Sequence, residues 1–232
     1  MRKARRAAAR RNRQLRIMFT DEARFGRMNR IRPCWAPIGM RPAVAAQLIR
    51  EYIYLYGAVS PKDGTCVYLI MPTSNTACFQ VFLDVLARKF AREDILLVLD
   101  GAPNHRCGDL VVPANITLLY LPPYSPELNP KENLWDEIRE KIFKNYALKS
   151  MDAVCAKLKQ AVLYIERNPK LVRSITAFPY IINSLCYRIG IRTGDCTFYM
   201  LYSVTHPRES LLHCNVGLAT YKVPATCRNS AF

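Results

Sequence analysis

The sequence lacks the features that mark membrane and secreted proteins. It contains no run of about 18 consecutive apolar residues, the length that a helix needs to span a bilayer. Its N-terminus also lacks the apolar core of a secretory signal peptide. Half of its 232 residues are hydrophobic, which is enough for one domain with a sizeable core plus extensions. We therefore expect a soluble cytoplasmic protein with no membrane partner.

The nine cysteines lack the spacing of a known cysteine framework. No two of them form a CxxC pair, and the odd count fits neither a complete disulfide framework nor a zinc ribbon. We expect most of them to be small buried apolar residues in a reducing compartment. The cysteines are Cys34, Cys66, Cys78, Cys107, Cys155, Cys186, Cys196, Cys214 and Cys227.

Acidic residues are scarce, because 18 Asp and Glu stand against 34 Lys and Arg, and the net charge is +16. The imbalance is greatest before Asp21, the first acid. The positive residues that precede it are Arg2, Lys3, Arg5, Arg6, Arg10, Arg11, Arg13 and Arg16. Such a block indicates that residues 1–16 form a basic arm that binds phosphates and releases their counterions. A solvated basic helix face or a ribosomal-type tail remains open, but nucleic acid is the leading partner.

Runs of β-branched and aromatic residues predict the strands. The stretch "RIMFTDEARF" predicts a short apolar strand interrupted by acids, and "CWAPIGMRP" predicts a loop. Two aromatic runs on either side of Asp63 and Gly64 predict a hairpin. The apolar run 95–99 stops at Asp100 and predicts a strand that is buried on both faces, hence central in a sheet. The stretch "ITLLY" predicts the next strand.

Apolar residues at helical spacing predict three helices. A stripe that begins at Phe79 predicts a helix ending near Ala91. A second helix is predicted from about Pro130 to Phe143, and a third begins at a Ser150 cap. The order is strand, hairpin, helix, buried strand, further strand and helices. We therefore predict an α/β fold with a mixed sheet flanked by helices.

The segment 184–232 shows neither a sustained helical nor a sustained strand period. It could be an added small domain, a tail with no selected fold, or a metal-binding appendage. The last of these would use His206, His213, Cys214 and Cys227, whose spacing matches no zinc pattern. We favour a poorly ordered tail.

Three acids lie at positions where an open α/β sheet presents functional groups. Asp21 interrupts the first strand, Asp100 ends the buried strand, and Glu132 follows a series of prolines at the start of a helix. Each has a plain alternative. Asp21 could be a surface carboxylate, Asp100 could begin an Asp-Gly turn, and Glu132 could form a capping box with Asn129. The prolines favour a functional role for the Glu132 side chain over a capping role, because a cap alone does not require a rigid segment before the helix.

Three carboxylates at one edge of a sheet repel one another and raise each other's pKa values unless a cation neutralises them. Mg²⁺ prefers carboxylate oxygens and keeps water positions open for phosphate. Two such ions, about 4 Å apart, activate the attacking hydroxyl and stabilise the leaving oxygen in phosphoryl transfer. We therefore predict a site for two Mg²⁺ ions, with Mn²⁺ as a substitute, in a basic protein that cuts or joins nucleic acid.

The stretches around the three acids resemble a known family. "FTDEARF", "LVLDGAPNH" and "PPYSPELNPKENLW" resemble, in order, the acidic motifs of DDE transposases of the mariner superfamily, in its bacterial insertion-sequence branch. The second and third acids are 132 − 100 = 32 positions apart, which is close to the spacing in that family. The third motif is highly specific. The resemblance runs from about Arg16 to Asn183.

The resemblance implies a ribonuclease-H-like fold for residues 17–183. In that fold the first acid lies on the first strand, the second follows the fourth strand, and the third lies on a following helix. The resemblance implies that Asp21, Asp100 and Glu132 are the catalytic triad and the metal ligands. Asp136, one turn beyond Glu132, is the alternative third ligand.

Three more residues lie within the matching motifs: Glu22, Asn104 and His105. The resemblance implies that they support the metal ligands or contact DNA. Trp135 is expected to pack against the sheet rather than to touch DNA.

The function that the resemblance implies is the catalytic domain of a cut-and-paste DNA transposase. Its partners would be terminal inverted repeats and target DNA in the nucleoid, and it would act as a homo-oligomer on DNA. Family members usually carry a helix-turn-helix domain before this core, which indicates half of a split transposase or a truncated remnant. The alternatives are a non-catalytic DNA-binding remnant that competes with the full-length enzyme, and a nuclease or junction resolvase with the same fold.

Overall fold

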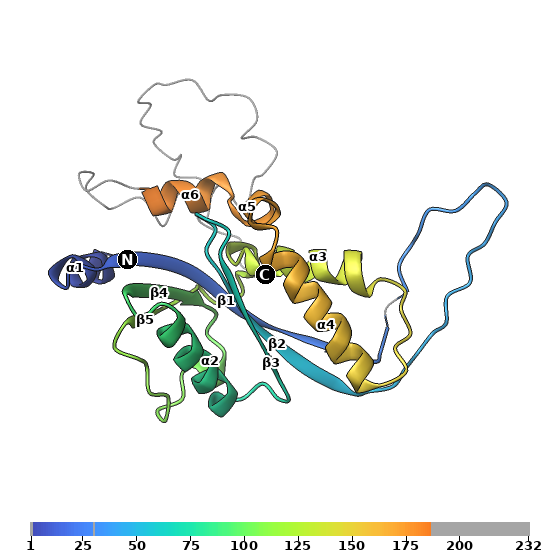
Figure 1. Cartoon of the computed structure of the whole chain (residues 1–232), viewed down its shortest axis with the longest axis horizontal. Helices are drawn as coiled ribbons and strands as arrows, with labels where there is room; N and C mark the ends of the chain where they lie inside the picture. The colour runs from blue at the N-terminus through green and yellow to red at the C-terminus, as the bar shows by residue number, and fades with distance from the viewer. Residues whose placement is uncertain (1, 30, 187–232) are drawn as a thin grey trace, which may run out of the picture. The chain divides into compact units, whose positions relative to one another are not determined.

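The computed structural model describes residues 2–29 and 31–186. Five strands in this part of the chain form one sheet in the order β3-β2-β1-β4-β5 (Figure 1). β2 lies antiparallel to β1 and β3, whereas β4 lies parallel to β1 and β5. The strands are β1 (Gln14–Gly26), β2 (Tyr52–Val59), β3 (Cys66–Met71), β4 (Glu93–Leu99) and β5 (Ile116–Tyr120). The predicted mixed sheet, the hairpin and the central buried strand are confirmed.

Helices cover both faces of the sheet (Figure 1). α2 packs on one face, and α3, α4, α5 and α6 pack on the other. The helices are α1 (Arg2–Arg10), α2 (Thr76–Lys89), α3 (Lys131–Ile138), α4 (Met151–Glu166), α5 (Pro169–Thr176) and α6 (Pro179–Cys186). Two 3₁₀ turns, η1 (Pro103–His105) and η2 (Pro126–Leu128), and a π-helical turn, η3 (Arg139–Phe143), complete the described elements.

The core is divided into two layers because successive side chains of a strand point to opposite faces. On β1, Phe19 belongs to the layer under α3 and α4, whereas its neighbour Met18 belongs to the layer under α2. On β4, Val98 lies in the first layer and Leu97 in the second, and both are almost fully buried. Alternation along β1 therefore places Asp21 on the side of α3 and Glu22 on the side of α2.

The prediction that acids interrupt the first strand is wrong. β1 continues for 13 residues, and Asp21 and Glu22 pair with Gly57 and Tyr56 of β2. The backbone of a strand pairs through its amide groups whatever the charge of its side chains, so two acids do not break the ladder. The consequence is that both carboxylates are held on a rigid element.

The alternative in which Glu132 forms a capping box with Asn129 is not observed. α3 begins at Lys131 with Pro130 at the cap position, one residue later than predicted. The backbone N–H of Asn129 donates to the carbonyl oxygen of Pro126 at 2.9 Å, so it is not available to Glu132. By contrast, the predicted Ser150 cap is confirmed, since its hydroxyl accepts a hydrogen bond from the backbone N–H of Ala153.

The basic N-terminal segment is part of the domain rather than a separate arm. α1 contacts β1 and β4, and its Ala4 and Ala8 side chains are buried. Arg16 lies within β1, where its guanidinium pairs with Glu93 at 2.8 Å and also with Asp63. Arg11 and Arg13 similarly approach Asp94 at 3.5 and 3.4 Å. These arginines neutralise acids at the start of β4, a use that the count of charges along the sequence could not reveal.

The prediction that most cysteines are buried is wrong for the described part of the chain. Cys66 and Cys78 are buried, but Cys107 and Cys155 are only half-buried, and Cys34 is exposed on the long loop between β1 and β2. All five are free thiols. The residues proposed for a metal-binding appendage lie beyond residue 186, outside the described residues. Within residues 2–29 and 31–186, no helix has the length and apolar composition of a membrane span.

Candidate active site

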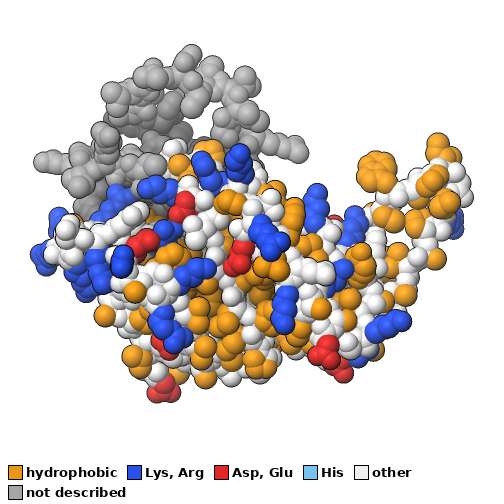
Figure 2. Space-filling model, viewed as in Figure 1, with side chains coloured by type: hydrophobic (Ala, Val, Ile, Leu, Met, Phe, Trp, Pro, Cys, Tyr) orange, Lys and Arg blue, Asp and Glu red, His pale blue; other side chains and the backbone are white. Residues whose placement is uncertain are grey.

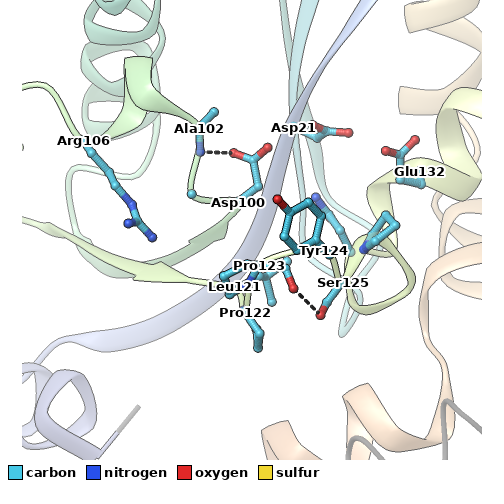
Figure 3. A pocket seen from close by; sticks show the side chains of 13 residues that line it. Asp21, Asp100, Ala102, Arg106, Leu121, Pro122, Pro123, Tyr124, Ser125 and Glu132 are labelled. Carbon is cyan, nitrogen blue, oxygen red and sulfur yellow. Dashed lines mark hydrogen bonds between the residues drawn. The ribbon is translucent and has the colours of Figure 1, made fainter. Parts of the chain in front are cut away.

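Asp21, Asp100 and Glu132 line one cavity of about 390 Å³ at the edge of the sheet (Figure 3). They come from three elements: β1, the loop after β4, and the first turn of α3. The parallel pairing of β1 and β4 brings the first two acids to the same end of the sheet. The rest of the lining is Gly101, Ala102, Arg106, Leu121, Pro122, Pro123, Tyr124, Ser125, Pro126 and Asn129.

Asp21 is held by a hydrogen bond from α3. The indole Nε1–H of Trp135 donates to its Oδ2 at 2.8 Å. Burial, together with repulsion from Glu132 and Glu22, raises the pKa of Asp21 to about 7, although the Trp135 hydrogen bond opposes the shift. Asp21 therefore needs either a proton or a nearby cation at neutral pH.

Asp100 is held by a buried histidine that also reaches β1. Nδ1 of His105 lies 2.8 Å from Oδ1 of Asp100, and Nε2 lies 2.9 Å from Oε1 of Glu22. The backbone N–H of Ala102 donates to the same Asp100 oxygen at 3.1 Å. Burial alone would lower the pKa of His105, but the Glu22 and Asp100 carboxylates raise it. A carboxylate at each ring nitrogen favours the imidazolium form, in which both nitrogens donate.

The ring of His105 is also fixed by its surroundings. It is 1% exposed and packs on the ring of Phe79, with the centroids 4.4 Å apart. The hydroxyl of Tyr120 donates to the backbone oxygen of His105 at 2.7 Å. These contacts fix one oxygen of Asp100 and leave the other directed away from the histidine.

Glu132 is the most loosely held of the three acids. It is exposed, and no described residue donates a hydrogen bond to its carboxylate. Its position is set by the start of α3, where the side-chain amide of Asn129 donates to the backbone oxygen of Thr20 at 3.1 Å. The other side-chain atom of this amide, Oδ1, accepts from the backbone N–H of Lys131 at 3.2 Å. Asn129 thus ties the helix that carries Glu132 to the strand that carries Asp21.

A buried lysine lies behind the acids. Lys131 is fully buried, and its Nζ has no hydrogen-bond partner. The ammonium lies 3.8 Å from the ring centroid of Tyr68 and 4.2 Å from that of Trp135. Burial lowers the pKa of Lys131 to about 7, although the charges of Cys66 and Asp21 oppose the shift. Gly57 makes room for it, since a Cβ there would lie 2.5 Å from Cε of Lys131.

The side chains that line the cavity include the kind of ligand that binds a divalent cation. Three carboxylates line the cavity, and burial, together with the charges of Glu132 and Glu22, raises the pKa of Asp21. Carboxylate oxygens are the ligands that Mg²⁺ and Mn²⁺ prefer. Among the described residues, no three His, Cys, Asp or Glu side chains lie close enough together to hold one ion. Binding of one ion by all three carboxylates therefore requires them to move closer together.

The other predicted residues have separate places. Glu22 and His105 support Asp100, as above. Asn104 is half-buried in η1 and does not line the cavity. Asp136 also lies outside the cavity lining, and its carboxylate approaches Arg139 at 3.7 Å. Trp135 packs against the sheet as predicted, but its hydrogen bond to Asp21 was not foreseen.

The sequence analysis did not assign three of the cavity residues to the site, Arg106, Tyr124 and Asn129, nor the buried Lys131 behind it. Two signals were available for them. Arg106 directly follows the second motif, and Tyr124 and Asn129 lie among the prolines of the third. Nothing in the sequence distinguishes Lys131 from an ordinary surface lysine of a helix.

A family model and two relatives match this chain in sequence. The family model described as "DDE superfamily endonuclease" matches residues 16–155. An uncharacterized protein, y4pE/y4sA, of Sinorhizobium fredii is 38% identical over 104 residues, which are 44% of this chain and 77% of that protein. The Tc3 transposase of Caenorhabditis elegans is 26% identical over 160 residues, covering 63% of this chain and 47% of the transposase.

Solved structures show the same fold. The Mos1 mariner paired-end complex with Mn has a TM-score of 0.51 and 17% identity, covering 82% of this chain and 62% of that one. A pre-cleavage Mos1 transpososome has a TM-score of 0.50 and 18% identity, covering 74% and 58%. The predicted ribonuclease-H-like fold is confirmed. The chain spans about half of the Tc3 transposase and about three fifths of these Mos1 chains.

Proposed function

Because the chain belongs to the DDE superfamily endonuclease family, we propose that it is the catalytic domain of a cut-and-paste DNA transposase. We assign it to the bacterial insertion-sequence branch of the mariner superfamily on the motifs around its three acids. The observation that carries the proposal is the convergence of Asp21, Asp100 and Glu132 on one cavity from β1, the end of β4 and α3.

The proposed reaction is two phosphoryl transfers at one site. In the first, the oxygen of water bonds to phosphorus and the 3′ oxygen leaves as a free hydroxyl. In the second, that hydroxyl attacks a target phosphate, and the target's own 3′ oxygen leaves. Two Mg²⁺ ions held by Asp21, Asp100 and Glu132 would supply charge neutralisation and Lewis acidity. Trp135 and His105 orient Asp21 and Asp100, because each fixes one carboxylate oxygen by a hydrogen bond.

The charge of the molecule supports a DNA substrate. Lys and Arg side chains are spread over the face shown in Figure 2, with few acids among them. Arg106 also lines the cavity, where its guanidinium would attract an entering phosphate (Figure 3). We propose terminal inverted repeats and target DNA as partners, by analogy with the paired-end complex of Mos1, and a homo-oligomer as the acting form.

The test is nicking and joining of a supercoiled plasmid by the purified full chain in Mg²⁺ or Mn²⁺. We expect cleavage that requires the metal and falls below detection in Asp21→Asn, Asp100→Asn and Glu132→Gln. Asp136→Asn is the matched control, since it removes a carboxylate one turn along α3 but outside the cavity. It should retain the wild-type rate.

Two results would overturn the proposal. Metal-dependent cleavage retained by Asp100→Asn would move the chemistry elsewhere. DNA binding by folded protein without any metal-dependent cleavage would instead identify a non-catalytic DNA-binding remnant, and cleavage without joining would identify a nuclease.

A further inference from the structure

Tyr124 presents a bare aromatic ring at the rim of the cavity. Its side chain is fully exposed, at 101% of the reference value, although it belongs to the loop that lines the cavity with the three acids. In Figure 3 the ring lies between Asp100 on one side and Glu132 on the other. No ring contact or hydrogen bond of this side chain is present among the described residues. An aromatic ring in such a place is available to a ligand.

The backbone of Tyr124 is strained. Its φ of +55° lies in the left-handed region, which disfavours residues other than glycine. The two other described non-glycine residues with positive φ are Asn12 and Asn145, and asparagine tolerates this region. Tyrosine does not tolerate this region in the same way, so the backbone conformation does not explain why a tyrosine occupies position 124.

The surrounding loop maintains the strained conformation. Pro122, Pro123 and Pro126 fix three φ angles around Tyr124. The hydroxyl of Ser125 donates to the backbone oxygen of Pro123 at 3.2 Å, which closes the turn. The loop then leads through η2 into α3, which carries Glu132. The backbone of Tyr124 is therefore held at a fixed place relative to the acids, and its ring projects from that place into solvent.

We propose that Tyr124 is a stacking platform for a nucleobase next to the scissile phosphate. This inference rests on the proposed function, which places that phosphate at the three acids. The ligand must offer a flat apolar face within a few ångströms of a phosphate, and a nucleotide does so. Base faces inside a duplex are covered by their neighbours, so the partner is an unpaired or terminal base. Stacking of this kind does not depend on base sequence.

The test measures the affinity of the full chain for two short DNA probes. Ca²⁺ replaces Mg²⁺ in the buffer, so that binding is measured without cleavage. One probe is a blunt duplex, and the other carries a single-stranded overhang containing 2-aminopurine, whose fluorescence is quenched by stacking. We expect Tyr124→Ala and Tyr124→Leu to weaken binding of the overhang probe by about 5- to 100-fold and to abolish the quenching. Tyr124→Phe keeps the ring and should keep both.

The matched control is Tyr146→Ala, since Tyr146 is 53% exposed but does not line the cavity. An abasic residue in place of 2-aminopurine should remove the difference between Tyr124→Ala and wild type. Equal loss in Tyr124→Phe and Tyr124→Ala would overturn stacking in favour of a hydroxyl contact. Equal binding by Tyr124→Ala and wild type would overturn the inference altogether. Failure of the proposed catalysis appears separately, in the cleavage of the plasmid.

Discussion

At the scale of the residue, both strand acids are held in the same way. A buried ring N–H from another part of the chain fixes one oxygen of each: Trp135 for Asp21 and His105 for Asp100. Glu22 in turn fixes the second nitrogen of His105. Outer hydrogen bonds of this kind orient metal ligands and affect how tightly the metal is bound.

The histidine can therefore be tested through the metal requirement. His105→Phe keeps a flat ring against Phe79 but removes both N–H donors. We expect the Mg²⁺ concentration for half-maximal cleavage to rise by about 10- to 100-fold, because Asp100 loses its fixed orientation. Titration calorimetry with Mn²⁺ should show the same loss without DNA. Glu22→Gln, which still accepts a hydrogen bond from Nε2, should change both quantities less. An unaltered Mg²⁺ requirement in His105→Phe would contradict this role.

The lowered pKa of the buried Lys131 leads us to predict that the stability of the fold depends on pH. Burial lowers its pKa from 10.5 to about 7, so between these values the unfolded chain binds a proton that the folded chain does not. The free energy of unfolding should therefore rise as the pH increases from about 7 towards 10.5. Lys131→Met should remove this contribution and stabilise the fold at pH 7 by about 1–4 kcal/mol, since it replaces a buried ammonium by an apolar group. Urea unfolding in EDTA at several pH values measures both effects. A Lys131→Met variant less stable than wild type at neutral pH would show that the ammonium is well compensated.

At the scale of the element, the site depends on how α3 is attached to β1. The prolines before α3 limit the paths of the chain, but it is Asn129 that makes the contact with β1, through the backbone oxygen of Thr20. This contact joins residues 109 positions apart. Glu132, in the first turn of the helix, has no hydrogen bond of its own to hold it among the described residues. Its place in the cavity therefore follows from the attachment of its helix.

Removing this attachment should affect both stability and cleavage. Asn129→Ala leaves the Thr20 oxygen without its side-chain donor, and we expect a loss of about 1–3 kcal/mol in the free energy of unfolding. Cleavage should fall as well, because Glu132 is displaced from the other acids. Ser150→Ala, which removes the cap of α4, is the control: it should cost about 1 kcal/mol of stability and leave the cleavage rate of the folded protein unchanged. Equal cleavage rates in Asn129→Ala and wild type would show that α3 is positioned by its packing alone.

At the scale of the whole molecule, the excess of positive charge divides into two groups. Arg16, and to a lesser degree Arg11 and Arg13, neutralise acids of the same domain. Arg6 and Arg10 are exposed on α1. Only charges of the second group can release counterions from DNA without breaking ion pairs in the protein.

The dependence of DNA affinity on salt distinguishes the two groups. Arg6→Gln and Arg10→Gln should each reduce the slope of log affinity against log salt concentration by about 1 if they contact phosphate, for specific and unrelated sequences alike. Arg16→Gln should leave the slope unchanged and instead lower the free energy of unfolding, because Glu93 loses its partner. Fluorescence anisotropy over a range of KCl concentrations gives the slopes. A reduced slope in Arg16→Gln would show that its ion pairs open on DNA.

The sequence by itself determined the order of the elements, the mixed sheet and the three acids. Side-chain periodicity is local, so the alternation of Met18 and Phe19 and the Ser150 cap could be predicted without knowing the path of the chain. The acids could be predicted because each lies within a short motif. At Glu132 the local spacing left a capping box open as an alternative, and the structure does not form one.

The tertiary structure decided which groups hold those acids. Trp135 and Asp21 are 114 positions apart, and Glu22 and His105 are 83 positions apart. Such contacts depend on where α3 and η1 pack against the sheet, which no local pattern encodes. The exposure of Tyr124, the burial of Lys131 and the internal ion pairs of Arg16 have the same origin, since burial is a property of neighbours brought together by folding.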